Sequence, residues 1–131
     1  MKIAAFILGV FLFCTSCSND DEGTAIDSNL VGEWVLTDVV CFCVFPEDVD
    51  FNTHELSFSS QKNTVIVINN SDTNYLYESG EYDYVSTADA ILFTIDNRSF
   101  TYQINDDELK LIYVDEPMIA DDEVTYAYKR K

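Results

Sequence analysis

Two cysteines separated by one residue, Cys41 and Cys43, are the side chains in this sequence most suited to chemistry. On an extended strand, residues two apart point to the same side with Cα atoms about 6.5–7 Å apart, the upper limit for a disulfide. Three states are therefore open: two buried thiols, a disulfide across a local kink, or a soft-metal site. A metal would need further ligands, for which the single histidine, His54, and Met118 are the candidates. No zinc-site spacing is present, so we expect no metal.

Carboxylates are the second group that could do chemistry, either as acid–base pairs or as calcium ligands. They gather in three clusters: Glu47, Asp48 and Asp50; Asp106, Asp107 and Glu108; and Asp115, Glu116, Asp121, Asp122 and Glu123. Calcium needs six to eight converging oxygens, and no cluster has EF-hand spacing, so solvated acidic loops are the alternative to a calcium site. The sequence also lacks a recognisable nucleophile–base motif and a glycine-rich phosphate loop. We therefore predict a protein that is not an enzyme, with no catalytic residues and no cofactor.

Acidic residues outnumber basic ones, 24 to 7, which gives a formal net charge of −17 at pH 7. Nucleic acid is bound by neutralising its phosphates with lysine and arginine, so this composition argues against a nucleic-acid partner. The negative field would instead attract a basic protein or divalent cations. The alternative is that the acidity only keeps the domain soluble and monomeric, and a monomer is what we expect.

Residues 1–16 have the pattern of a signal peptide. Lys2 is followed by an apolar run over residues 3–13. As a helix this run would span about 16 Å, too short for a roughly 30 Å hydrocarbon core, so a removable signal peptide is predicted and not a transmembrane helix. Thr15-Ser16-Cys17 resembles the lipobox of bacterial lipoproteins, although Cys14 stands where leucine is usual. The resemblance implies cleavage before Cys17 and lipidation of that residue, which would anchor the protein to a membrane. The alternative is a plain secretory signal cleaved elsewhere.

The acidic segment 18–22 follows this cysteine directly. It resembles the export tag of surface lipoproteins of Bacteroidota, which implies an outer-membrane lipoprotein exposed on the cell surface. The alternatives are a solvated acidic spacer and a location on the periplasmic face. We predict that residues 17–29 form a flexible tether, with an end-to-end distance of roughly 20 Å.

The remaining chain, residues 30–131, has the length of one domain and the alternation of β-strands. The predicted strands are 32–45, 54–59, 63–69, 75–85, 90–95, 98–104, 108–114 and 122–130. In 98–104, for example, Phe100, Tyr102 and Ile104 share one face, and in 90–95 Ile91, Phe93 and Ile95 do so. Short turns between the strands indicate antiparallel hairpins. Closure would remove the exposed edges, so we predict an all-β, eight-stranded, antiparallel up-and-down barrel.

Gly32-x-Trp34 at the head of the first predicted strand, followed by this meander, resembles the lipocalin-like domains of Bacteroidota surface lipoproteins. The resemblance implies that Trp34 closes the floor of the barrel and that a cation of the last strand, Arg130 or Lys129, lies over its ring. Trp34 as an ordinary core residue is the alternative.

Large side chains dominate the predicted inward face, so the barrel is either filled or a calyx with room for one small ligand. The residues expected to line a calyx are Tyr82, Tyr84, Tyr102, Tyr113, Tyr126 and Tyr128. The favoured hypothesis is a membrane-anchored, lipocalin-like, non-enzymatic protein that binds a small amphipathic molecule at the barrel mouth. One alternative is an acidic module that binds a basic protein, as small lysozyme inhibitors do, although Ser79-Gly80-Glu81-Tyr82 lacks the arginine of their Ser-Gly-x-Arg-Tyr motif. Another is a filled-core accessory protein of the cell envelope.

Overall fold

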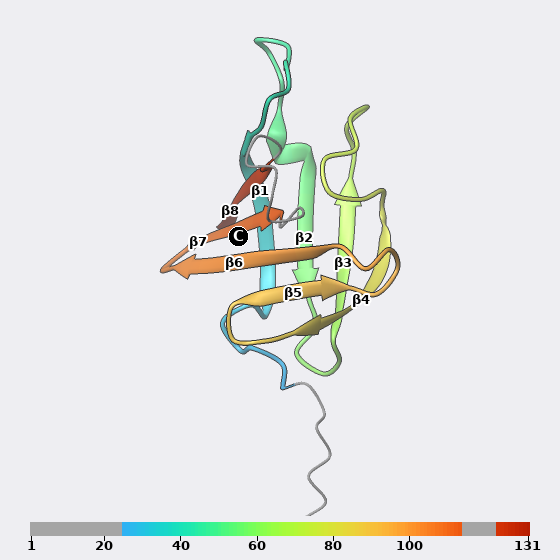
Figure 1. Ribbon diagram of the computed structural model, residues 1–131. Coiled ribbons are helices and arrows are strands. Elements are labelled where there is room, and N and C mark those ends of the chain that lie inside the picture. Colours follow the sequence, from blue (N-terminus) through green and yellow to red (C-terminus); the bar gives the residue numbers. More distant parts are fainter. Residues whose placement is uncertain (1–24, 114–122) are drawn as a thin grey trace, which may run out of the picture.

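The chain folds into a closed antiparallel β-barrel (Figure 1). The computed structural model describes residues 25–113 and 123–131. Within these ranges lie the strands β1 (Gly32–Val40), β2 (His54–Phe58), β3 (Thr64–Asn69), β4 (Gly80–Ser86), β5 (Ala90–Phe93), β6 (Ser99–Asn105), β7 (Glu108–Tyr113) and β8 (Thr125–Arg130), with the 3-10 helix η1 (Phe51–Thr53). The predicted eight-stranded up-and-down barrel is therefore confirmed. The one described helix is only 3 residues long, far short of what is needed to cross a bilayer.

Strand β1 closes the barrel because it pairs along both of its edges. Each strand pairs with its neighbour in sequence, and β1 also pairs with β8, with Trp34 opposite both Leu56 and Arg130. A register shift between Leu36 and Asp38 interrupts the β1–β8 ladder, where the hydroxyl of Thr37 donates to the carbonyl of Ala127 at 3.0 Å. Bulges of this kind bend a strand and increase its twist, which helps a sheet to close on itself.

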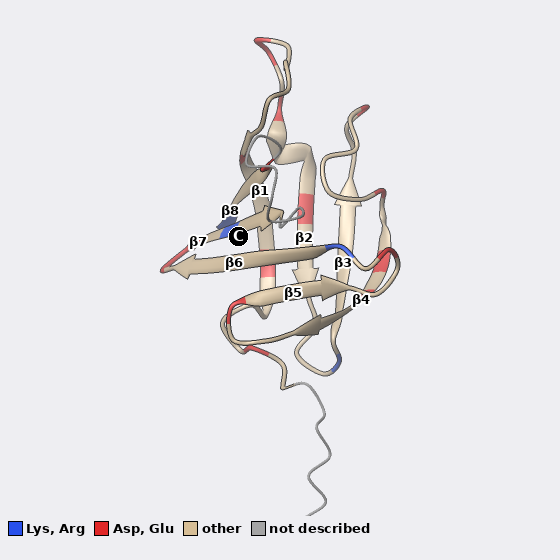
Figure 2. Ribbon diagram, viewed as in Figure 1, with Lys and Arg blue, Asp and Glu red and all other residues tan. Residues whose placement is uncertain are grey.

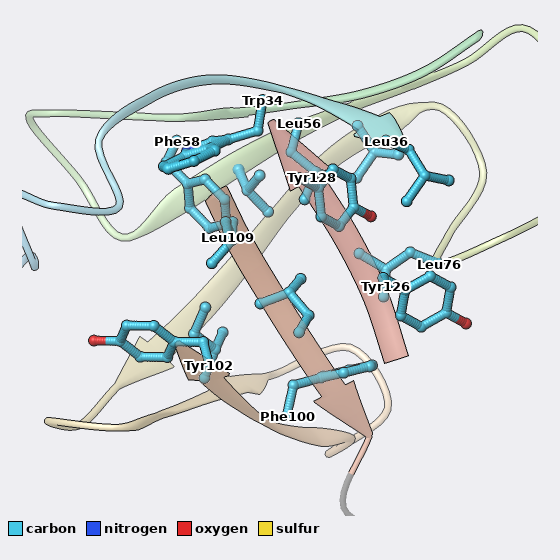
Figure 3. Packing of buried hydrophobic residues seen from close by; sticks show 14 of the residues in the cluster. Trp34, Leu36, Leu56, Phe58, Leu76, Phe100, Tyr102, Leu109, Tyr126 and Tyr128 are labelled. Atoms are coloured by element: carbon cyan, nitrogen blue, oxygen red, sulfur yellow. The ribbon is translucent and has the colours of Figure 1, made fainter. Parts of the chain in front are cut away.

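Alternate side chains of the strands point inward and form one hydrophobic core. In β2, buried and half-buried residues alternate along the whole strand. Most of the aromatic residues predicted to face inward are buried: Phe58, Tyr84, Phe93, Phe100, Tyr102, Tyr126 and Tyr128. Two more are partly buried, Tyr82 and Tyr113. Figure 3 shows side chains from facing strands directed into this core. For these aromatic residues the period-two pattern therefore identified the inner surface correctly.

Several predicted strands extend beyond the strands in the structure, and three of the differences bear on the site or the core. β1 ends at Val40 and not at residue 45, because Cys41 and Cys43 approach to a Cα–Cα distance of 5.2 Å, too short for an extended chain. β4 begins at Gly80 and not at residue 75. β5 ends at Phe93, and the turn that follows leaves Ile95 64% exposed, so its predicted inward orientation is wrong.

The two ends of the barrel are built differently. In Figure 1 the segment before β1 lies at the lower end, and the β1–β2 and β3–β4 connections rise at the upper end. We call the upper end, formed by residues 41–53 and 70–79, the mouth. The lower end, where residues 25–31 meet the start of β1 and the end of β8, is the floor.

Trp34 and Arg130 close the floor. The Trp34 side chain is fully buried, and its indole N–H donates to the carbonyl of Leu30 at 2.8 Å. The guanidinium of Arg130 lies 4.1 Å from the centre of the Trp34 ring and donates to the carbonyls of Val31 and Asn29 at 2.9 and 2.8 Å. Gly32 makes this approach possible: its φ is +123°, and a Cβ there would lie 2.9 Å from Arg130 Nη1. Arg130, and not Lys129, is therefore the cation over the tryptophan.

We expect Arg130→Met to lower the free energy of unfolding by about 2–3 kcal/mol, because it removes a cation–π contact worth about 0.5–2 kcal/mol and two charge-assisted hydrogen bonds while keeping an apolar stem. Lys129→Met is the control, since this neighbouring side chain is exposed, and it should cost less than about 0.5 kcal/mol. Urea titration followed by Trp34 fluorescence measures both. Equal losses in the two variants would contradict the role given to Arg130.

Candidate binding site at the barrel mouth

A groove of about 380 Å³ opens at the mouth of the barrel. It is bounded by the end of β1, the segment after it, the β3–β4 connection and the start of β8. The residues that line it are Val39, Cys41, Phe42, Cys43, Phe45, Thr73, Asn74, Tyr75, Glu123, Val124 and Tyr126. Its volume lies within the range of small-molecule sites, which are typically apolar with a few polar groups.

Aromatic side chains form one wall of the groove. Phe45 packs edge-on against Phe51, with ring centres 5.4 Å apart, and Tyr75 lies 6.1 and 5.5 Å from these two rings. Phe51 is the first residue of η1, whose N-terminus is capped by the Asp50 carboxylate accepting from the Asn52 N–H at 3.0 Å. The cap and the ring contacts fix the β1–β2 connection against the barrel, so this wall is preformed.

The rim next to this wall carries large apolar side chains in water. Phe42 is 92% exposed and Val44 is 98% exposed. Between β1 and Phe45 the chain is constrained by the disulfide that joins Cys41 and Cys43. Adjacent exposed apolar side chains at a concave site are typical of a surface that binds something.

Three consecutive residues of the β3–β4 connection, Tyr75, Leu76 and Tyr77, plug the barrel below the groove. All three are buried, with exposed fractions of 6%, 3% and 8%, so this segment does not show the alternation of a strand with one wet face. This is why the predicted strand 75–85 begins only at Gly80. The Tyr126 hydroxyl donates to the Tyr75 carbonyl at 2.5 Å and so ties the plug to β8.

Arg98 holds the other end of the plug. Its guanidinium lies 4.3 Å from the centre of the Tyr77 ring and donates to the Leu76 carbonyl at 3.2 Å. The Tyr77 hydroxyl donates to Asp96 at 2.9 Å, and Asp96 also pairs with Arg98 at 2.6 Å. Burial, together with the hydrogen bond to Asp96, raises the pKa of Tyr77 well above its usual value. The tyrosine therefore stays neutral, and the plug is fixed by polar contacts at both ends.

His54 lies beneath the plug and is fully buried. Its ring sits 5.9 Å from those of Tyr75 and Tyr128. Within the described part of the chain, neither of its ring nitrogens nor the hydroxyls of Tyr75, Tyr84 and Tyr128 has a hydrogen-bond partner. Burial lowers the pKa of His54 to about 4, so the imidazole is neutral at pH 7. The interior below the groove is thus aromatic but not free of polar atoms.

The six tyrosines predicted as a ligand lining do not form one surface. Tyr126 lines the mouth groove. Tyr82 stacks on Tyr77 with ring centres 4.8 Å apart, and Tyr113 packs 5.4 Å from Phe100.

The other three lie deeper in the barrel or toward its floor. Tyr128 packs on His54, Tyr84 lies 5.5 Å from Phe58, and Tyr102 donates to Asp27 at 2.7 Å, near the floor. Figure 3 shows Tyr102 directed away from Tyr126 and Tyr128. Between mouth and floor these rings contact their neighbours, and the groove at the rim provides room for a ligand.

Several groove residues were missed by the sequence pattern because they lie on irregular chain. Thr73, Asn74 and Tyr75 belong to the β3–β4 connection, and Phe42 and Phe45 to the connection after β1. Two signals could have identified them: the run over 39–45, where both faces of the predicted strand are apolar, and three large apolar residues in a row at 75–77.

Among the described residues, the acidic clusters do not converge on one point. Within residues 25–113 and 123–131, no three carboxylate, histidine or cysteine side chains lie close enough together to hold a metal ion. Glu123 lines the groove, whereas Asp115, Glu116, Asp121 and Asp122 lie outside the described residues. The predicted lipidation site, Cys17, and the signal segment 1–16 also lie outside them.

No protein-family model matches this chain, and no curated protein sequence matches it either. The class of the protein is therefore defined by its fold, a lipocalin-like eight-stranded barrel, and the site by the geometry of its mouth.

We expect acid to destabilise the protein through His54. The pKa of His54 is about 4 in the folded state against 6.5 for an ordinary histidine, so between these values the unfolded state binds more protons and stability falls as pH falls. Between the two pKa values the free energy of unfolding should fall by about 1.4 kcal/mol per pH unit. The total loss should reach about 3 kcal/mol by pH 4 and level off below that pH.

His54→Leu isolates this effect, since the carboxylates that titrate in the same range are common to both proteins. Urea titrations at several pH values between 7 and 4 should show the stability of the wild type falling relative to the variant by about 3 kcal/mol. A constant difference between the two across this range would contradict a buried, neutral His54.

Proposed function

We propose that this protein is a surface-anchored, lipocalin-like lipoprotein that binds a small amphipathic molecule in the mouth groove. The observation that carries the proposal is the groove itself, a preformed apolar concavity of about 380 Å³ at one end of a rigid closed barrel. Rings in contact fill the barrel below it, which supports a site at the rim and not a deep calyx.

The lining of the groove indicates the chemistry of its ligand. Val39, Phe45 and Tyr75 supply apolar contact, and Thr73 and Asn74 supply hydrogen-bonding groups at the edge. Among the described residues of the lining, Glu123 is the charged one, and the whole chain carries a net charge of −17. A neutral or cationic amphipath fits this field, whereas an anionic one would be repelled.

The placement of the two ends supports a surface role. The chain enters the barrel at the floor, and the groove opens at the mouth, at the other end (Figure 1). A lipid on Cys17 would hold the floor toward the membrane and present the groove to the surrounding medium. The same geometry serves a protein on either face of the outer membrane, and the acidic segment 18–22 favours the cell surface.

A second candidate function is binding of a basic protein. The exposed apolar pair Phe42 and Val44 lies in the same connection as three exposed carboxylates, Glu47, Asp48 and Asp50. Figure 2 shows this connection with acidic residues and no basic ones. An apolar contact surrounded by negative charge matches the usual core-and-rim organisation of protein interfaces.

Phe42→Ser should separate the two functions when it is compared with Val44→Ser. Phe42 lines the groove and Val44, two residues further on and equally exposed, does not. Neither change should affect folding. We expect Phe42→Ser to weaken binding of a neutral apolar dye, N-phenyl-1-naphthylamine, by about three- to tenfold, because the dye loses part of one aromatic contact. Val44→Ser should leave the dissociation constant within about twofold.

Fluorescence titration on residues 25–131, which contain every strand of the barrel, measures both constants. Absence of dye binding to the wild type would reject the groove as a ligand site. A complex with a basic protein that is salt-sensitive and is lost equally in both variants would instead support the second function.

Cys17→Ala should release the protein from membranes and abolish its acyl modification, because the proposed anchor is attached to that sulfur and to its new amine. Cys14→Leu, which removes the other cysteine of the segment and supplies the usual lipobox residue, is the control and should leave both unchanged. Cell fractionation and mass spectrometry of the mature N-terminus check the two variants. A Cys17→Ala protein that remains in the membrane fraction would reject the lipid anchor.

A further inference from the structure

The disulfide between Cys41 and Cys43 lies in the wall of the mouth groove. Cys43 is exposed and Cys41 is half-buried, and Phe42 between them extends into solvent with 92% of its surface exposed. Of the two cysteines, Cys43 is therefore the more accessible residue to a thiol that enters the groove.

This disulfide contributes little to holding the barrel together. It closes a loop with a single intervening residue, and the shortest loops restrict the unfolded chain least. It also lies beyond the last residue of β1, whose position is already fixed by pairing with β2 and β8. Exposed disulfides that do not stabilise a core are the ones that exchange readily with thiols.

We propose that Cys41–Cys43 is a thiol–disulfide exchange site for small neutral or cationic thiols, including cysteine-containing peptides, that bind in the mouth groove. The proposal goes beyond ligand binding, because it assigns a covalent step to the wall of the groove. It does not depend on which amphipathic molecule the groove holds.

The step proceeds by displacement at sulfur. The thiolate of the incoming molecule attacks Sγ of Cys43, a mixed disulfide forms, and the Cys41–Cys43 bond breaks with its electron pair on Cys41, which then takes a proton from water. A second incoming thiolate attacks the substrate sulfur of the mixed disulfide and releases Cys43. Two substrate thiols are thereby oxidised to one disulfide, the protein disulfide is reduced to two thiols, and no other oxidant takes part.

The charge around the site selects the thiol. Glu123 lines the same groove as the two cysteines, and Glu47, Asp48 and Asp50 are exposed in the connection that carries them. The groove lining contains no lysine or arginine among its described residues. This field repels an anionic thiolate most strongly when it carries a second negative charge, and least when an ammonium group on the same molecule balances its charge.

The experiment compares three small thiols that differ mainly in charge: cysteamine, 2-mercaptoethanol and 2-mercaptoethanesulfonate. The full chain in detergent carries Cys14→Ser and Cys17→Ser, so that Cys41 and Cys43 are its remaining cysteines. Samples are quenched in acid and alkylated, and mass spectrometry then follows loss of the disulfide and maps the mixed disulfide. Rates are divided by the thiolate concentration of each reagent and by its rate with a linear disulfide, which removes differences in nucleophilicity.

We expect the corrected rate to be about tenfold higher for cysteamine than for the sulfonate at low salt, with 2-mercaptoethanol between them, and the ratio to fall below about threefold at about 1 M salt. The mixed disulfide should form on Cys43. Glu123→Gln should reduce the low-salt ratio by about half, whereas Glu108→Gln, an exposed carboxylate on β7 outside the groove lining, should leave it unchanged.

Three results would overturn the proposal: a disulfide that survives all three thiols while Trp34 fluorescence shows a folded barrel, equal corrected rates for the three reagents, or mixed disulfide confined to Cys41. Failure of dye binding with normal exchange would reject only the ligand function. Normal dye binding with no exchange would reject only the disulfide site.

Discussion

Pairing between β1 and β8 is the constraint on which the rest of this molecule depends. It joins the first and last strands of the domain, so every strand has two partners and no edge is left for another chain to extend. The same pairing sets Arg130 opposite Trp34 and thereby forms the floor. At the other end it sets Tyr126 opposite Val39, two residues that both line the mouth groove. One ladder of hydrogen bonds thus positions both the stabilising contact and the site.

The volume of the aromatic side chains determines where a ligand has room. Eight strands enclose a space that side chains can fill, and here Phe58, Tyr84, Phe93 and Phe100 do so with rings in contact. The plug at Tyr75 adds to this filling from above. The groove that could bind a ligand is consequently formed by irregular segments at the rim. These can change in length and composition without altering the barrel, because they contribute no pairs to the ladders.

The fold could be predicted from the sequence because the strands have one wet and one buried face. In the strands that contain Phe100 and Tyr128, the alternation of apolar and polar residues matches the alternation of buried and exposed side chains. Gly32 and Trp34 indicate the floor because few other residues fit its positive φ and its packing. The site was harder to predict. At 39–45 and 75–77 the apolar residues are consecutive, and a periodic pattern cannot distinguish a strand buried on both faces from a loop folded against a core. Their positions follow from tertiary packing and from the Cys41–Cys43 bond, which no periodicity records.

The exposed ring of Phe42 at the rim has a consequence for copies of this protein that come close together. The exposed Phe42 side chains of neighbouring copies would associate if nothing opposed their approach. The surplus of carboxylates on every copy imposes a mutual repulsion that extends about a Debye length, roughly 8 Å in physiological salt, before these side chains touch. The excess negative charge therefore opposes association through this exposed apolar contact when the protein is concentrated, and the distance at which two copies repel each other depends on ionic strength.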